Sequence, residues 1–142
     1  MLIPFMAQHL KELELQEQQV TMVSLVGDLD NYAKVLESYG PCFSYEREGK
    51  VLGCGGFMDT WPGRSILWCL LSKDAGSHLV DITRSVRKVM KHYPRHRFEA
   101  TVQYDFKEGH RWMKLLGFEL EAERMKKFSP DKVDYSLYAR VA

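Results

Sequence analysis

The sequence has few cysteines, no long apolar run and almost no net charge, and each shortage argues against a class of protein. Its 142 residues include three cysteines, Cys42, Cys54 and Cys69, with no CxxC pair and no Cys/His cluster of zinc-binding spacing. We therefore expect neither a disulfide framework nor a metal site, and we interpret the cysteines as small buried hydrophobic residues. The formal net charge is +1, which gives no overall field to attract nucleic acid or an anionic membrane.

Targeting segments are also missing. No apolar run approaches the roughly 18 residues that a membrane span requires. The first residues, MLIPFMAQHLKELE, have neither a basic start nor a long apolar stretch, so they do not resemble a signal peptide. We expect a protein that begins near Met1 and stays in the cytoplasm, with a single domain over residues 1–142.

Helix and strand patterns alternate along the chain. Helical spacing of apolar residues predicts helices over 6–18, 28–38, 78–93 and 107–116. Strands are predicted at 1–5, 42–47, 50–59, 65–71, 98–103, 118–128 and 133–141. The order β-α-α-β-β-β-α-β-α-β-β indicates an α+β fold of three layers, with a mixed central sheet and helices on both faces.

Two of these strands define the centre of the predicted sheet. SILWCLL, residues 65–71, is a continuous apolar run, which is typical of a strand covered on both faces. FEATVQ, residues 98–103, alternates apolar and polar residues, and the helix 78–93 connects the two segments. A strand, a helix and a second strand in series predict parallel neighbours joined by a crossover.

The segment HRWMKLLGFELE, residues 110–121, ends a predicted helix on Gly117. Glycine readily takes the left-handed conformation that closes a helix, and Phe118 then returns to the core. Together with the element order, KLLGF resembles the signature that follows the fifth strand in the GNAT superfamily of N-acetyltransferases, over nearly the whole chain. The resemblance implies a GNAT-like fold and transfer of an acetyl group from acetyl-CoA to an amine.

A second motif of the resemblance is KDAGSH, residues 73–78. In the superfamily, a basic or Gln residue, two residues of any type, Gly, one residue and then Gly or Ala open a helix whose free amides hold a pyrophosphate. Lys73 and Gly76 match this pattern. His78 stands where a small residue is usual, and Asp74 adds a negative charge. The alternative is a simple strand–helix turn capped by Ser77.

The resemblance implies a cofactor site at this turn. The amides of Gly76, Ser77 and His78 would hold the pyrophosphate of acetyl-CoA beside Lys73. The strand residues before the turn would pair with the pantetheine arm. The implied cofactor-binding residues are Leu70, Leu71, Lys73, Gly76, Ser77 and His78.

The usual catalytic groups of the superfamily are replaced. SILWCLL carries no carboxylate, the position of the usual tyrosine acid holds Met113, and that of the usual asparagine holds Phe106. Nearby polar residues that we consider as catalytic substitutes are Tyr104, Asp105 and His110. The alternatives are a half-buried core residue for Tyr104, a helix cap for Asp105 and a surface position for His110. The resemblance therefore implies an acyltransferase with a degenerate active site.

A narrower resemblance covers roughly residues 20–121. EGKVLGCGGF, ILWCLLS and GHRWMKLLGF are similar, in order and spacing, to a small GNAT-like protein of the internal virion protein type in short-tailed bacteriophages. It implies a non-catalytic alternative, in virion assembly or in binding phage or host proteins, in the host cytoplasm or in the virion.

The basic run at 84–97 holds six Arg and Lys residues and two His residues. On a helix it forms either a solvated face or a contact for the CoA 3′-phosphate, an acidic protein or nucleic acid. Because acidic residues elsewhere balance it, a nucleic-acid function is not favoured.

Overall fold

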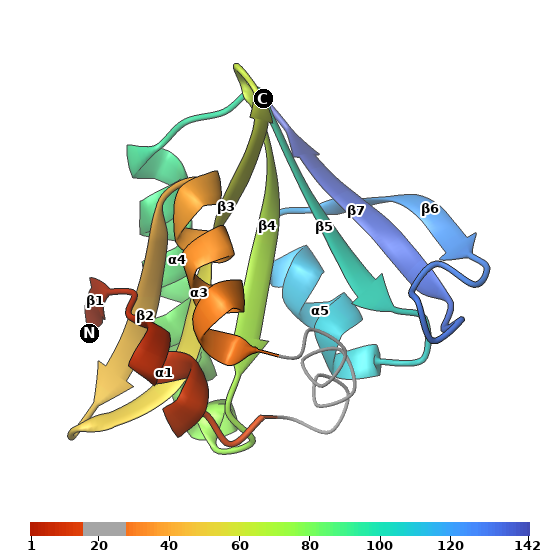
Figure 1. Ribbon diagram of the computed structural model, residues 1–142. Helices are drawn as coiled ribbons and strands as arrows, with labels where there is room; N and C mark the ends of the chain where they lie inside the picture. The colour runs from red at the N-terminus through yellow and green to blue at the C-terminus, as the bar shows by residue number, and fades with distance from the viewer. Residues whose placement is uncertain (16–27) are drawn as a thin grey trace.

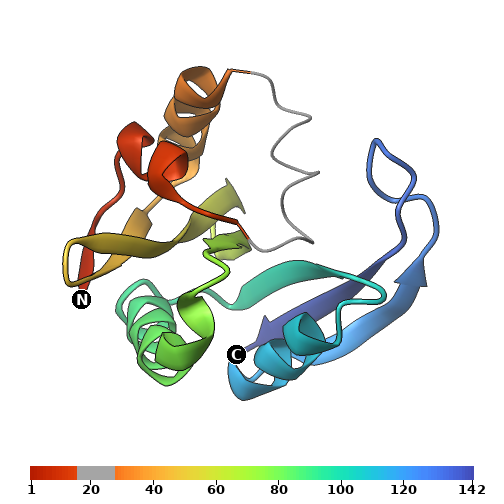
Figure 2. The same cartoon turned by 90° about the horizontal axis from the view of Figure 1, so that it is seen from below.

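Seven strands form one sheet with helices on both faces (Figures 1 and 2). The computed structural model describes residues 1–15 and 28–142. The strands are β1 (Leu2–Pro4), β2 (Cys42–Arg47), β3 (Lys50–Trp61), β4 (Arg64–Leu71), β5 (Arg97–Gln103), β6 (Glu119–Met125) and β7 (Tyr135–Val141). The helices are α1 (Ala7–Glu12), α3 (Leu29–Tyr39), the 3₁₀ helix η1 (Ala75–His78), α4 (Leu79–His92) and α5 (Lys107–Leu115).

The order of strands across the sheet is β1-β2-β3-β4-β5-β7-β6. β4 is central, as its apolar sequence predicts. It pairs with β3 in antiparallel fashion and with β5 in parallel fashion, and η1 and α4 make the crossover between β4 and β5. The predicted three-layer α+β fold and the predicted parallel pair are therefore confirmed.

Two hydrophobic cores lie against the sheet, and Figure 2 shows α4 and α5 on one of its faces and α1 and α3 on the other. The larger core joins the sheet to α4 and α5 and includes Ile82, Trp112 and Phe118. The smaller one joins it to α1 and α3 and includes Leu10 and Leu36. Within the described ranges, no helix is both long enough and apolar enough to cross a membrane.

The first predicted helix, 6–18, is shorter than expected. α1 ends at Glu12, and Leu13 is already extended, with ψ near 126°. After that point the chain pairs with the end of β4, because Leu15 forms a bridge with Ser72 and the carbonyl of Glu14 accepts the amide of Lys73. Pairing with a distant strand therefore replaces the predicted helix at residues 13–15, and residues 16–18 of the prediction lie outside the described residues.

Two predicted helix boundaries are confirmed in detail. The side chain of Asp28 accepts a hydrogen bond from the amide of Asp30 and caps α3. Gly117 has φ of 86° and ends α5, while the amide of Phe118 bonds to the carbonyl of Met113. This is the Schellman ending expected of Leu-Gly-Phe, and Phe118 is buried.

Candidate functional site

The central pair of strands opens like a V (Figure 1). β4 and β5 are paired only through Arg64–Arg97, Ser65–Phe98 and Ile66–Glu99. Beyond Ile66, β4 pairs with β3 and not with β5, and β5 continues beside β7. A cavity of about 470 Å³ occupies this region and is lined by residues of both diverging strands. The fold therefore places an opening in the middle of its sheet.

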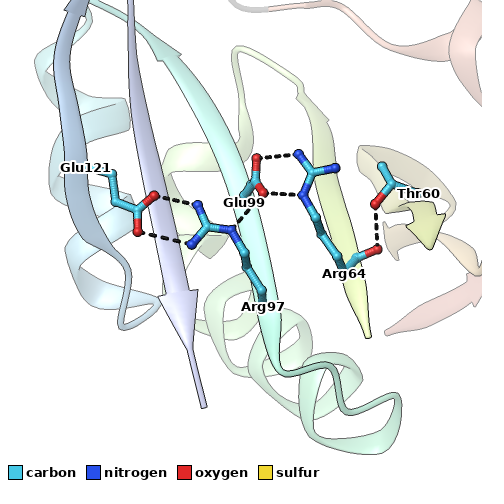
Figure 3. Close-up of polar contacts among 5 residues, drawn as sticks. All are labelled: Thr60, Arg64, Arg97, Glu99 and Glu121. Carbon is cyan, nitrogen blue, oxygen red and sulfur yellow. Dashed lines mark hydrogen bonds and ion pairs between the residues drawn. The ribbon is translucent and has the colours of Figure 1, made fainter. Parts of the chain in front are cut away.

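A row of alternating charges holds the closed end of the V (Figure 3). Arg64 of β4 donates a hydrogen bond to Glu99 of β5, with 2.9 Å between Nη2 of Arg64 and Oε1 of Glu99. Arg97 donates to the same carboxylate, with 2.8 Å between its Nε and Oε2 of Glu99. Arg97 also pairs with Glu121 of β6 across β7, where Ala139 is opposite Glu99. This row ties three strands together where β4 and β5 have only a short ladder.

The electrostatics of the row favour its charged form. Hydrogen bonds from Arg64, and then from Arg97, lower the pKa of Glu99 below its ordinary value although burial opposes this. Arg97 similarly lowers the pKa of Glu121. The carboxylate of Glu99 is thus ionised and fully engaged, which makes it a weak base.

The turn at the open end of β4 leads into α4. Residue Gly76 lines the cavity and is exposed. Its φ is outside the left-handed region, and an added Cβ would meet no heavy atom within 4 Å. Neither backbone conformation nor packing therefore requires glycine there, whereas close approach of a ligand would.

The turn also lacks the cap that the alternative interpretation expected. His78, and not Ser77, is the N-cap of α4, and no side chain caps that helix. Ser77 belongs to η1. The amide of Leu79, the first residue of α4, donates to the carbonyl of Gly76. The anion site implied by the sequence would therefore use the amides of Gly76, Ser77 and His78 in η1.

The two charges of the motif are engaged with other elements. The Nζ of Lys73 lies 2.9 Å from Oε2 of Glu14, and the Nζ of Lys50 lies 2.7 Å from Oδ2 of Asp74. Lys50 lowers the pKa of Asp74, and Glu14 raises the pKa of Lys73. Lys50 therefore offsets the negative charge of Asp74, which would otherwise repel a bound pyrophosphate. Lys73 can contact such an anion only if its ion pair with Glu14 breaks.

The structure brings some of the predicted cofactor residues together. Leu70, Leu71 and Gly76 line the cavity, so the strand and the turn present one continuous wall. Lys73, Ser77 and His78 lie beside that wall and outside the lining. Their roles stay predictions.

The three candidate catalytic residues lie outside the cavity lining. The guanidinium of Arg124 stacks 4.4 Å from the ring of Tyr104, and Asp105 is exposed. His110 is half-buried and hydrogen-bonded on both ring nitrogens, to the hydroxyl of Tyr138 at 2.6 Å and to the carbonyl of Tyr104 at 2.9 Å. The surface position considered for His110 is therefore wrong, as is the cap considered for Asp105, since Phe106 is the N-cap of α5.

Apolar residues take the two positions at which the superfamily has polar groups. Met113 and Phe106 both line the cavity, and Met113 is buried. Neither side chain can donate or accept a proton. Neither position therefore supplies an acid or a base to the cavity.

Cysteine thiols in the cavity wall are neutral. Burial raises the pKa of Cys54 to about 11 and that of Cys69 to about 12. Both residues line the cavity. A thiolate nucleophile is disfavoured there. Of the three cysteines predicted to be buried, Cys54 is buried, whereas Cys42 and Cys69 are partly exposed.

Sequence reasoning missed several lining residues. Tyr32, Trp68, Thr101, Gln103 and Tyr135 come from α3, β4, β5 and β7, and meet only through the sheet order. One signal was present, because the alternation of FEATVQ puts Thr101 and Gln103 on the same face. For the other three residues, no local pattern marks the cavity.

Solved structures of acetyltransferases share this architecture. A ribosomal-protein-alanine N-acetyltransferase from Brucella melitensis has a TM-score of 0.79 at 16% identity, over 100% of this chain and 99% of its own. The microcin C7 self-immunity acetyltransferase MccE, solved in complex with acetyl-CoA and AMP, has a TM-score of 0.76 at 15% identity, over 99% and 91%. An acetyltransferase of the GNAT family from Bacillus anthracis has a TM-score of 0.71 at 15% identity, over 99% and 93%.

Sequence comparisons add nothing to this likeness, since no protein-family model matches the chain and no curated protein is similar to it in sequence. At these low identities, structural similarity establishes the fold alone, which this chain shares with these acetyltransferases, one of them of the GNAT family.

Proposed function

We propose that this chain binds acetyl-CoA in the V-shaped gap between β4 and β5 and transfers the acetyl group slowly to an amine. The observation that carries the proposal is the open cavity of about 470 Å³ with Gly76 on its wall. An anion can approach the amides of Gly76, Ser77 and His78 without meeting a side chain at position 76. The structure of MccE, which has a similar fold, was solved in complex with acetyl-CoA and AMP.

The diverging strands suit the rest of the cofactor. Leu70 and Leu71 provide an apolar edge along which an extended arm would lie. Acetyl-CoA would supply an activated thioester, and the protein would supply its orientation. Orientation of two bound reactants alone provides several kcal/mol. The missing acid at Met113 removes a contribution of about 10²–10⁴-fold, so we expect slow transfer.

A second candidate function is non-catalytic. Met113 and Phe106 make the cavity wall apolar where the superfamily has polar groups. That observation favours a GNAT-fold protein that binds a partner, for which phage virion assembly, in the host cytoplasm or the virion, is the role implied by the narrower sequence resemblance. Under this alternative, the cavity is kept for binding, and transfer is lost.

Thermal unfolding with acetyl-CoA, followed by an assay of thiol release, separates the two functions. A ligand at 100 times its Kd stabilises the folded state by about 2.7 kcal/mol. We expect acetyl-CoA to raise the unfolding temperature and thiol to be released when an accepted amine is added. Stabilisation without thiol release from any amine would favour the non-catalytic role. No stabilisation at saturating acetyl-CoA would contradict acetyl transfer and would leave partner binding as the supported function.

A further inference from the structure

One side of the cavity faces α1 and α3, and aromatic and aliphatic residues dominate it. Trp68 and Tyr32 pack against the core on that side. Because side chains alternate along a strand, Ile66 lies on the same side as Trp68. Thr101 lies there too, since its neighbours Ala100 and Val102 pack in the opposite core. We call this surface the acceptor wall, and its residues are Tyr32, Met58, Ile66, Trp68, Thr101 and Tyr135.

The acceptor wall is the side left for a second substrate. Figure 2 shows α4 and α5 on the other face of the sheet, where Ala75 and Leu79, on either side of the segment 76–78, pack in the larger core. A donor held by the amides of Gly76, Ser77 and His78, in η1 before α4, therefore enters from that face. The second substrate then reaches the thioester from the face of Trp68 and Thr101.

No free charge stands on the acceptor wall. Among the described residues that line the cavity, Glu108 is the only Asp, Glu, Lys, Arg or His. Glu108 lies in the first turn of α5, on the opposite face of the sheet. Its side chain is 68% exposed, and its Oε1 lies 3.9 Å from Nη2 of Arg111. Glu99 lies two residues before Thr101 on the same face, but Arg64 and Arg97 neutralise it.

The tyrosines of the wall also stay neutral. Burial raises the pKa of Tyr32 and of Tyr135 above the ordinary value of tyrosine. Within residues 1–15 and 28–142, the wall therefore offers neither a counter-charge for an ammonium group nor a free carboxylate to remove its proton. Burying an unpaired charge in such surroundings costs several kcal/mol.

These observations restrict the acceptor. An alkylamine with a pKa near that of lysine, about 10.4, is only about 0.1% uncharged at pH 7.5. An aromatic amine is uncharged there, and its ring matches the surfaces of Trp68 and Tyr32. We propose that the acceptor is an aromatic amine that enters the cavity as the neutral base. This inference rests on the proposed acetyl transfer.

The reaction balances without a protein base. The nitrogen lone pair bonds to the thioester carbonyl carbon, the carbon–sulfur bond breaks, and the sulfur leaves as a thiolate. Nitrogen loses one proton to solvent, and the thiolate takes up one from solvent. The products are an anilide and CoA.

Aniline and benzylamine are the matched probes, because both carry one phenyl ring and only benzylamine is charged at neutral pH. Calorimetry measures their binding between pH 6.5 and 8.5, and thiol release from acetyl-CoA measures transfer. We expect the affinity and rate for aniline to be constant with pH, and those for benzylamine to rise about tenfold per pH unit as its neutral fraction grows. Benzylamine that binds equally well at all these pH values would overturn the proposal.

A carboxylate added to the wall should reverse the preference. Thr101→Asp changes an exposed position in the cavity, and Thr60→Asp makes the same change outside the cavity lining. We expect Thr101→Asp to improve binding of benzylamine at pH 7 at least tenfold and Thr60→Asp to leave it unchanged. An equal effect of both variants would contradict the wall as the amine site. An acid limb in the rate profile that disappears in Glu108→Gln would also overturn the proposal, because Glu108 would then be the base.

The binding measurement separates this inference from the proposed function. If acetyl-CoA neither binds nor releases thiol, acetyl transfer fails, while the pH dependence of benzylamine binding still decides whether the wall excludes an ammonium group. If acetyl-CoA binds and alkylamines are acetylated with a pH-independent KM, transfer stands and the neutral-amine inference fails.

Discussion

Removing the charge of Glu99 should weaken the junction between β4 and β5 more than any change at the outer end of the ion-pair row. Glu99→Gln keeps the shape of the side chain, but it removes the charge and replaces one of two oxygens with an NH2 donor. Those two oxygens accept three charged hydrogen bonds, two from Arg64 and one from Arg97. Glu99 is 8% exposed, so its arginine partners would face one another with little water. Only three residue pairs of β4 and β5 remain to hold this end closed.

The structure sets the size of the effect. Breaking one partner of a fully buried ion pair costs about 3–5 kcal/mol. The side chains of Arg64 and Arg97 are 20% and 27% exposed, so solvent compensates part of the loss. We expect the free energy of unfolding to fall by about 2–3 kcal/mol, which corresponds to a decrease of about 5–10 °C in Tm for a chain of this size.

Urea unfolding at pH 7 measures the loss, with Glu121→Gln as the matched control. Glu121 ends the row, and its side chain is 39% exposed, so its loss should be much smaller. The pH dependence gives a second signature. Because the pKa of Glu99 is lowered in the folded state, its stabilisation is present above the unfolded pKa and is lost as pH falls through the folded pKa. Equal losses for Glu99→Gln and Glu121→Gln, or a difference that does not shrink in acid, would refute this reasoning.

Three further predictions concern the site and the helix that borders it. Met113→Tyr, which restores the acid usual in the superfamily, should raise acetyl transfer measured by thiol release, and should leave it at zero if acetyl-CoA does not bind. Tyr104→Phe, Asp105→Asn and His110→Ala test the predicted catalytic residues, and a parent protein with ordinary enzyme rates that none of these changes lowers would show that the chemistry lies elsewhere. Gly117→Ala should reduce the free energy of unfolding by about 1 kcal/mol, because φ of 86° strains alanine, whereas equal stability in urea would show that the left-handed ending is not required.

Local sequence was sufficient for most of the fold because its signals act within a few residues. The cap at Asp28, the Schellman ending at Gly117 and the apolar run of β4 each contain their own physical cause. The predicted end of the first helix was wrong for the opposite reason, because Leu15 pairs with Ser72 far along the chain. Apolar spacing alone could not show that a strand end would compete for these residues.

The site was predictable only in part. The turn at Gly76 was predictable from its motif. Met113 was placed by counting back from Gly117, and Phe106 was placed from the end of the predicted strand 98–103. The ion-pair row was not predictable, because Arg97 reaches Glu121 only after β7 inserts between β5 and β6 and presents the small Ala139. The partner of Lys73 depends equally on where the segment after α1 lies.

Calorimetric titration of acetyl-CoA into the parent protein and into Gly76→Val tests cofactor binding in the V-shaped gap most directly. A Cβ at position 76 meets no heavy atom within 4 Å, so the variant should unfold at a temperature close to that of the parent. We expect one molecule of acetyl-CoA to bind the parent, and Gly76→Val to lose binding because its side chain enters the space in front of the amides. The absence of binding to the parent, or equal affinities for the two proteins, would contradict the proposed site.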